Sequence, residues 1–282
     1  IAAAILIPTI LCIVLAIQLG KVSKELQMIK EQHAIISTNT VEIQDLPADY
    51  EETDLSDSDS DDEVSEEDTV ISDNTRKVYL TFDDGPSIYT DEILDILAQY
   101  GVKATFFVIG QEDEKYTPMY ERIVEEGHSI GMHSYSHKYT EIYDSLDSFT
   151  KDVEDIRNLI KEKTGVECSL YRFPGGSSNS IGREHMSDYI AYLNEENIVY
   201  YDWNVSSKDA TGNSVSVEEI VENSTSGLEN YSNAVILFHD TAEKYTTVQA
   251  LPQIIETILA MDNTEIVPIT ENSVPVQHIA NE

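Results

Sequence analysis

The side chains in this sequence that could do chemistry are carboxylates, imidazoles and one arginine, placed beside short apolar runs. His133 and His137 are four residues apart, so in a helical turn both imidazoles lie on one face and can share a metal ion. Asp83 and Asp84 begin an Asp-Asp-Gly-Pro sequence, which is also typical of a tight turn at the end of a strand. A metal site and a pair of surface histidines beside an ordinary turn are therefore both open at this point.

Two further polar positions have the same double interpretation. Arg172 lies within Ser-Leu-Tyr-Arg-Phe-Pro-Gly-Gly; it could be a surface charge, although a charged side chain at the end of an apolar strand is energetically unfavourable. His239-Asp240 could be a capped turn. Cys168 precedes an apolar run and is interpreted as a small core residue rather than a nucleophile.

The segments that must position these motifs alternate between two kinds of apolar pattern. Seven short runs rich in β-branched and aromatic residues predict strands at residues 77–82, 104–110, 128–132, 169–173, 198–203, 234–238 and 265–269. Six segments between them have helical spacing, at residues 93–100, 119–126, 153–160, 183–197, 217–228 and 251–261. Alternating strands and helices predict an α/β fold with a parallel sheet, either closed as a barrel or open and doubly wound.

The positions of the polar residues favour the barrel, because they follow five different strands. They are Asp83 and Asp84 after the first strand, His133 and His137 after the third, Arg172 and Asp202 at the ends of the fourth and fifth, and His239 after the sixth. Reacting groups of α/β barrels gather at the carboxyl ends of several strands, whereas an open sheet concentrates its site near one switch point. We therefore expect a barrel-like closure of about seven parallel strands.

Composition excludes several classes of protein. The chain of 282 residues carries 53 acidic and 17 basic side chains, for a net charge of -36, which argues against binding to nucleic acid or to an anionic membrane surface. Cys12 and Cys168 are the only cysteines, so a disulfide scaffold and a cysteine-based zinc finger are excluded.

The first quarter of the sequence predicts an anchor and a tether. Residues 1–20 are almost entirely apolar and long enough to span a bilayer as a transmembrane helix, with a cleaved signal peptide as the rival interpretation. Residues 21–75 are polar and predict a disordered linker, because residues 42–73 carry 15 acids and no base. The predicted catalytic domain covers residues 76–273, and residues 274–282 are a C-terminal tail.

In combination and order, five motifs resemble the polysaccharide deacetylases, carbohydrate esterase family 4 with the NodB homology domain. They are TFDDGP (81–86), HSYSH (133–137), RFPGG (172–176), YDW (201–203) and LFH (237–239). The resemblance implies a distorted (β/α) barrel, in agreement with the strand count. It also implies a divalent metal, usually Zn²⁺ with Co²⁺, Ni²⁺ or Mn²⁺ as alternatives, held by Asp84, His133 and His137.

The resemblance also assigns roles to the remaining motif residues. Asp83 would be the catalytic base, oriented by Arg172, and His239 the general acid, with Asp202 holding its imidazole. The backbone N–H of Gly175 would stabilise the oxyanion, although the family usually has a bulkier residue there. Substrate contacts would come from Trp203 and Leu237.

The activity implied is removal of N-acetyl groups, with release of acetate. With the anchor and tether, it suggests an enzyme of the cell membrane whose catalytic domain is extracellular, or a secreted one if residues 1–20 are cleaved. N-acetylglucosamine of peptidoglycan is the expected substrate, ahead of another extracellular or chitin-like glycan and of O-acetyl esters such as acetylxylan. A non-catalytic carbohydrate-binding domain or adhesin is the alternative from another class; nothing in the sequence names a protein partner.

Overall fold

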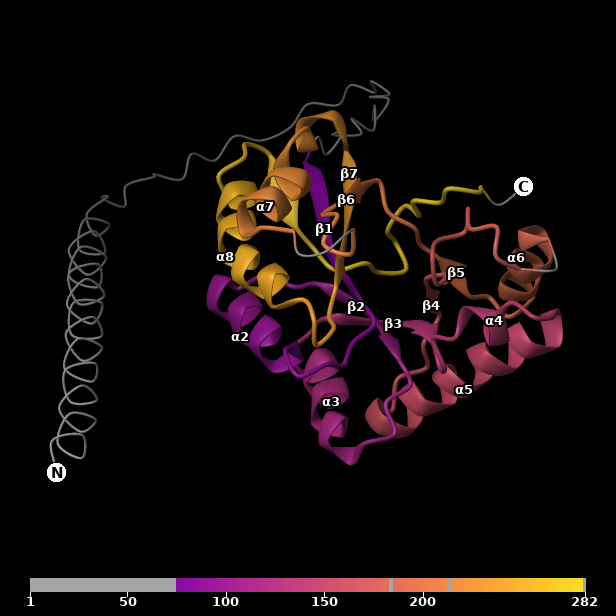
Figure 1. Ribbon diagram of the computed structural model, residues 1–282. Coiled ribbons are helices and arrows are strands. Elements are labelled where there is room, and N and C mark those ends of the chain that lie inside the picture. Colours follow the sequence, from indigo (N-terminus) through magenta and orange to yellow (C-terminus); the bar gives the residue numbers. More distant parts are fainter. Residues whose placement is uncertain (1–74, 183–184, 212–214, 281–282) are drawn as a thin grey trace, which may run out of the picture. The chain divides into compact units, whose positions relative to one another are not determined.

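The computed structural model describes residues 75–182, 185–211 and 215–280, and its centre is a parallel β-sheet (Figure 1). The strands are β1 (Arg76–Asp83), β2 (Thr105–Ile109), β3 (Ser129–Ser134), β4 (Leu170–Tyr171), β5 (Val199–Tyr200), β6 (Val205–Ser206), β7 (Asn233–His239) and β8 (Thr264–Ile266). Their order is β5-β4-β3-β2-β1-β7-β6, and β8 pairs with the beginning of β1. Every strand pairing is parallel, as the sequence predicted.

The helices surround this sheet, with α2, α7 and α8 on one side of the view and α4, α5 and α6 on the other (Figure 1). Their bounds are α2 (Thr90–Tyr100), α3 (Thr117–Glu125), α4 (Tyr139–Ile142), α5 (Leu146–Thr164), α6 (Met186–Glu195), α7 (Val217–Thr225) and α8 (Tyr245–Leu259). Two short 3₁₀ turns are η1 (Glu114–Tyr116) and η2 (Leu228–Asn230). All six predicted helices are confirmed, and α4 is an additional short one.

Local signals set several helix ends. The Ser145 side chain accepts a hydrogen bond from the Ser148 amide and begins α5, while Ser216 and Glu219 form a capping box at the start of α7. Gly101 and Gly165 end α2 and α5 in the left-handed conformation, with φ of 66° and 75°. Glycine ends both helices because a side chain in this conformation would be strained.

The hydrophobic core is centred on β1, whose last six residues are all buried. The Phe82 ring stacks between Phe106 of β2 and Phe238 of β7, with ring centroids 5.1 and 5.4 Å away. This arrangement buries a large apolar area on both sides of one strand and fixes its register against its neighbours. The end of β1 is therefore held rigidly where Asp83 and Asp84 follow.

The predicted strand at 198–203 differs from the structure, and the difference decides how the sheet closes. Only β5 pairs with β4; the Asp202 amide donates instead to the carbonyl of Val276. The Asn204 side chain then bonds the β7 backbone at Asn233 and Val235, and β6 follows beside β7. Within the described residues no pairing joins β5 to β6, so the sheet is a curled, incomplete barrel whose edges are linked by residues 201–204.

Two predicted segments have different outcomes. The anchor at 1–20 and the linker up to residue 74 lie outside the described residues, and no helix within the described ranges is long and apolar enough to cross a membrane. The C-terminal tail, by contrast, is bound to the domain as far as it is described. The Ile279 amide donates to the Ser177 hydroxyl, and the His278 amide donates to the Asp202 carboxylate.

Candidate active site

Asp84, His133 and His137 converge at the carboxyl end of the sheet. One oxygen of Asp84 lies 3.4 Å from Nε2 of His133 and 3.0 Å from Nε2 of His137. One ligand atom from each of the three residues lies within 4.8 Å of the others. The predicted ligand residues are therefore brought together.

The donor set fits a divalent cation. Nδ1 of His133 lies 2.7 Å from the carbonyl oxygen of Arg172, which fixes the ring so that Nε2 faces Asp84. Oδ1 of Asp84 is buried and accepts no hydrogen bond of good geometry from the part of the chain that the structure describes, although two imidazole nitrogens face it. A buried, unsatisfied carboxylate oxygen between two imidazoles is the environment that a bound cation completes.

Electrostatics favour the protonation states that metal binding requires at His133 and Asp84, whereas at His137 burial is outweighed by the hydrogen bond and charge of Asp84, which raise the pKa. Burial lowers the pKa of His133, which favours the neutral imidazole. Burial would raise the pKa of Asp84, but contact with His137 and the charges of the two imidazoles outweigh it and hold that pKa far below its usual value. A carboxylate and a neutral imidazole are both suitable ligands.

Asp152 of α5 organises the turn that follows β3 and carries His137. Its carboxylate accepts hydrogen bonds from the Ser134 hydroxyl at 2.7 Å and from the amides of Tyr135 and Ser136, both at 3.0 Å. The Ser134 hydroxyl in turn accepts one from the His137 amide at 2.8 Å. The sequence analysis did not identify Asp152. The signal that could have found it is its position on the face of α5 that is otherwise apolar.

The predicted base and its orienting arginine also meet. Nη1 of Arg172 donates to Oδ1 of Asp83 at 2.8 Å, and the side chains of both residues are buried. The other Asp83 oxygen lies 3.9 Å from Nε2 of His133, so the carboxylate stands beside the metal ligands. The two side chains predicted to act together are therefore in contact beside the metal ligands.

Arg172 is fully buried and joins several strand ends. It also donates to the Thr81 hydroxyl at 2.7 Å and to the carbonyl oxygens of Tyr201 and Asp202 at 3.0 and 2.9 Å. Its guanidinium lies 4.2 Å from the centroid of the Phe107 ring. A buried guanidinium with its donors satisfied fixes the Asp83 carboxylate in place.

The partner of the predicted acid is Asp209, and the assignment of that role to Asp202 is wrong. Nδ1 of His239 lies 2.8 Å from Oδ1 of Asp209, whose other oxygen accepts from the His239 amide and the Thr247 hydroxyl at 2.8 and 2.9 Å. Burial would lower the pKa of His239, but the hydrogen bond and charge of Asp209 raise it above its usual value. His239 therefore favours the protonated form that an acid needs.

The cause of the error is the short strand β6. It pairs with β7, with Ser206 opposite Leu237, so the residues that follow it reach the His239 backbone. Asp202 lies before β6, and its carboxylate accepts from the amide and hydroxyl of Ser177 at 2.8 and 2.5 Å. A signal for Asp209 was present in the extended Asn-Val-Ser run just upstream of it.

The expected oxyanion donor and substrate contacts have distinct surroundings. Gly175 has φ of 81°, and a Cβ there would lie 3.1 Å from the Tyr139 ring. The Trp203 ring lies beside Gly176 and 5.9 Å from the Arg172 guanidinium. Leu237 is buried in β7 two residues before His239, which puts both side chains on the same face of that strand.

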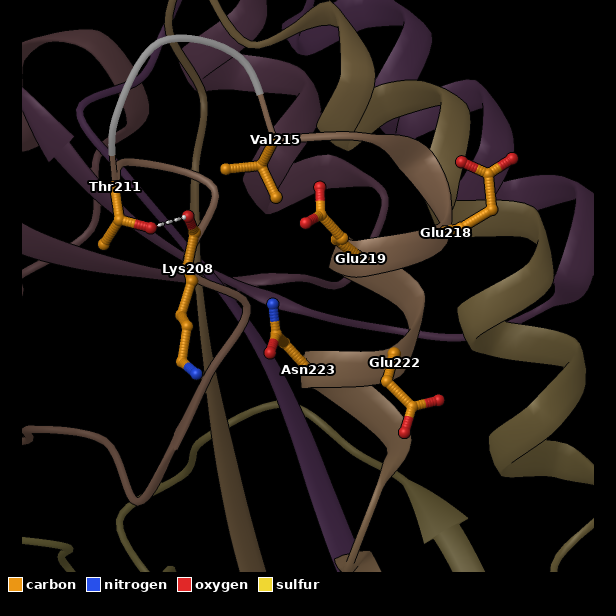
Figure 2. Close-up of a pocket in the computed structure, with 7 residues that line it drawn as sticks. All are labelled: Lys208, Thr211, Val215, Glu218, Glu219, Glu222 and Asn223. Carbon is orange, nitrogen blue, oxygen red and sulfur yellow. Dashed lines mark hydrogen bonds between the residues drawn. The ribbon is translucent and has the colours of Figure 1, made fainter.

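Two hollows in the surface differ in whether the candidate site residues line them. One of about 240 Å³ is lined by Asp84 and His137 together with Ile88, Tyr116 and Thr241, so it opens directly beside the metal ligands. A larger one, of about 620 Å³, lies between Lys208 and the glutamates of α7 (Figure 2). Its lining contains none of the proposed metal, base or acid residues, so of these two hollows only the smaller one adjoins the candidate site.

Comparisons with known proteins agree with this geometry. The sequence model described as Polysaccharide deacetylase matches residues 70–191. A solved structure, the catalytic domain of a peptidoglycan N-acetylglucosamine deacetylase from Eubacterium rectale, is 39% identical with a TM-score of 0.69, and the match covers 74% of this chain and 94% of that one. The chain belongs to the polysaccharide deacetylase family.

Other polysaccharide deacetylases extend the comparison. A peptidoglycan-N-acetylglucosamine deacetylase of Bacillus cereus is 30% identical over 66% of this chain and 83% of its own length. A putative polysaccharide deacetylase of Bacillus subtilis is 33% identical over 64% of this chain. The match spans 62% of that relative's length, and 63% and 65% of two further Bacillus cereus deacetylases.

Proposed function

We propose that this protein is a metal-dependent deacetylase that removes N-acetyl groups from a cell-wall glycan and releases acetate. The observation that carries the proposal is the meeting, at one rim, of a three-residue metal site, an arginine-held carboxylate and a carboxylate-held imidazole. Hydrolysis of an amide needs these three functions together, because the carbonyl is unreactive and the amine leaves badly.

Asp84, His133 and His137 would hold the cation, with Zn²⁺ the first choice for two imidazoles and one carboxylate and Co²⁺, Ni²⁺ or Mn²⁺ as alternatives. The chemistry that such a cation supplies is polarisation of a carbonyl and a lower pKa for a water molecule. The remaining steps are carried by side chains and backbone of this chain.

Asp83 takes the proton from the attacking water, because its carboxylate lies beside the metal ligands and is fixed by Arg172. His239 gives a proton to the departing nitrogen; it sits opposite Asp83 in the register of β1 and β7. Asp209 holds the His239 ring in one tautomer and stabilises its charge. The Gly175 N–H would stabilise charge on the carbonyl oxygen, with Trp203 and Leu237 lining the acetyl group.

Peptidoglycan N-acetylglucosamine is the proposed substrate. It is supported by relatives described as peptidoglycan N-acetylglucosamine deacetylases, at 30 to 39% identity. The apolar run at 1–20 and the acidic run after it support a catalytic domain outside the cell membrane. Detection of the protein in the membrane fraction, with the domain open to added protease in intact cells, would test the location.

The decisive experiment measures acetate released by the purified full chain, with bound metal quantified in the same sample. Purified peptidoglycan is the main substrate, and N-acetylated chitin oligomers and acetylated xylan are the comparison substrates. Release from peptidoglycan that is lost in Asp83→Asn, with metal retained, would support the proposal. Release from xylan alone would make the protein an O-acetyl esterase, and metal binding without any release would favour a carbohydrate-binding role.

A further inference from the structure

Tyr139 lies beside the candidate site but has no role in the chemistry above. It is the first residue of α4 and follows the ligand His137 by two positions. The two rings meet edge to face, with centroids 5.4 Å apart and planes at 83°. The Tyr139 ring therefore stands next to the more exposed of the two imidazole ligands.

The ring also occupies the space beside Gly175. A Cβ built on Gly175 would lie 3.1 Å from Cε1 of Tyr139 and 3.6 Å from its hydroxyl oxygen. Gly175 has φ of 81°, so a side chain at this position would be both strained and crowded. The volume that a side chain of residue 175 would take is thus filled from a different loop, by Tyr139.

The Tyr139 ring packs against Tyr143, and its hydroxyl group is left without a hydrogen-bond partner among the described residues. Tyr143 packs against it at 6.3 Å between centroids, and the buried Tyr143 hydroxyl donates to the Pro174 carbonyl at 2.9 Å. Tyr139 itself is half-buried, and its hydroxyl has no hydrogen-bond partner within the described ranges. An aromatic side chain with a fixed body and an unpaired hydroxyl is suited to contact a ligand that has both apolar and polar groups.

We propose that Tyr139 is a substrate-contacting residue that positions the reacting N-acetylhexosamine unit, with its ring packed on the sugar and its hydroxyl bonded to a sugar hydroxyl. The inference rests on the proposed function, because the sugar is placed by its acetamide between the metal ligands and Gly175. A pyranose offers a face of C–H groups and a rim of hydroxyls, which matches this side chain. The ring is pre-ordered by Tyr143, so little side-chain entropy is lost on binding.

The test compares two substrates on the metal-loaded full chain, N-acetylglucosamine oligomers and 4-nitrophenyl acetate, which has no sugar. Tyr139→Ala should raise KM for the oligomers by about tenfold or more, and the loss of kcat/KM should be about tenfold larger for oligomers than for the aryl ester. Tyr139→Phe should lose an intermediate amount, because it keeps the ring but not the hydroxyl. Tyr100→Ala is the matched control, since Tyr100 is a partly buried tyrosine at the opposite end of the strands, where α2 ends before β2.

Equal losses on both substrates, or a weaker metal dissociation constant that accounts for the loss, would overturn the inference and leave Tyr139 as support for His137. Absence of acetate release by the unsubstituted protein would instead refute the proposed function. In that case, oligomer binding to Tyr139→Ala, measured by calorimetry, still decides the inference, because contact with the sugar does not require turnover.

A double-mutant cycle with Gly175→Ala tests whether the ring and residue 175 share one space. Gly175→Ala should lower kcat/KM for the oligomers, since the added Cβ meets the Tyr139 ring. If the space is shared, the combined loss in the double variant should be at least about threefold smaller than the product of the single losses. Losses that simply multiply would contradict this premise of the proposal.

Discussion

The rim of the sheet has two halves that hold their functional side chains by different means. In the half formed by β1 and β3, strands of eight and six residues pair with β2: Asp83 ends β1, Asp84 follows it, and His133 lies in β3 where the pairing with β2 shifts register. In the half that follows β5 and β6, each strand has two residues, and hydrogen bonds to buried carboxylates hold the chain. Asp202 there accepts from Ser177 and His278, and Asp209 accepts from His239 and Thr247.

The difference shows that a buried carboxylate can replace a strand pairing. Each of these aspartates accepts from a backbone amide as well as a hydroxyl, so removing it leaves buried donors unsatisfied. On the long-strand side, a side chain can be removed while the backbone keeps its partners. We therefore expect substitutions in the first half to act on chemistry, and substitutions in the second half to act on position as well.

The largest effect is expected from the metal ligands. His133→Ala or His137→Ala should remove the bound metal and lower acetate release at least about 10³-fold, because two remaining ligands hold a divalent ion poorly. Asp83→Asn should lose comparable activity but keep its metal. Metal analysis of the purified variants measures the difference, and equal metal loss in all three would make Asp83 a ligand.

The next effect distinguishes the two aspartates of the short-strand half. Asp209→Asn should lower kcat by about 10²-fold and move the alkaline limb of the pH profile to lower pH. The sign follows from His239: Asp209 raises its pKa, activity falls as pH rises through that pKa, and loss of the carboxylate lowers it.

Asp202→Asn is the matched control for that experiment. It should leave the alkaline limb where it is and lower the melting temperature, because its partners are Ser177 and the C-terminal residues. A limb that moves in Asp202→Asn but not in Asp209→Asn would restore the assignment drawn from the sequence.

A smaller effect is expected from Asp152→Asn. The new amide group would place a donor against groups that themselves donate, so the turn that carries His137 should loosen. Metal affinity should then fall about 10- to 100-fold. Asp155→Asn is the control, since Asp155 lies on the same helix and forms an ion pair with the exposed Lys151. An unchanged metal dissociation constant in Asp152→Asn would show that the strand alone positions the ligands.

The smallest effect concerns Asp240, a buried carboxyl whose hydrogen bonds, among the described residues, come from the hydroxyls of Ser87 and Thr90. Without a backbone amide as partner, burial raises its pKa to about 6. The folded state then keeps a proton that the unfolded state releases between pH 4 and 6, so stability falls as pH rises through this window. In Asp240→Asn the change in melting temperature between pH 4 and pH 6 should be smaller by a few degrees than in the unsubstituted protein. An equal change in both proteins would contradict the raised pKa.

The same contrast explains which predictions from the sequence succeeded. The parallel α/β fold, six helices and the positions of Asp83, Asp84, His133, His137, Arg172 and His239 followed from long apolar runs that end in polar motifs. Asp209 and Asp152 leave only weak signals, an extended run before the one and an apolar helix face around the other, and neither signal identifies the groups that the carboxylate contacts. Their roles depend on tertiary hydrogen bonds, which periodicity in the sequence does not record.

The register of β1 has a consequence for how the protein folds. Among the described strands β1 leaves the ribosome before the others, but β7, which pairs with seven of its residues and sets His239 opposite Asp83, comes from more than 150 residues later. Such distant pairing makes folding slow, since the chain must close a long loop before the pairing stabilises it. Until β7 is made, one edge of a hydrophobic central strand is open, so truncated chains that end before residue 233 expose a template for aggregation.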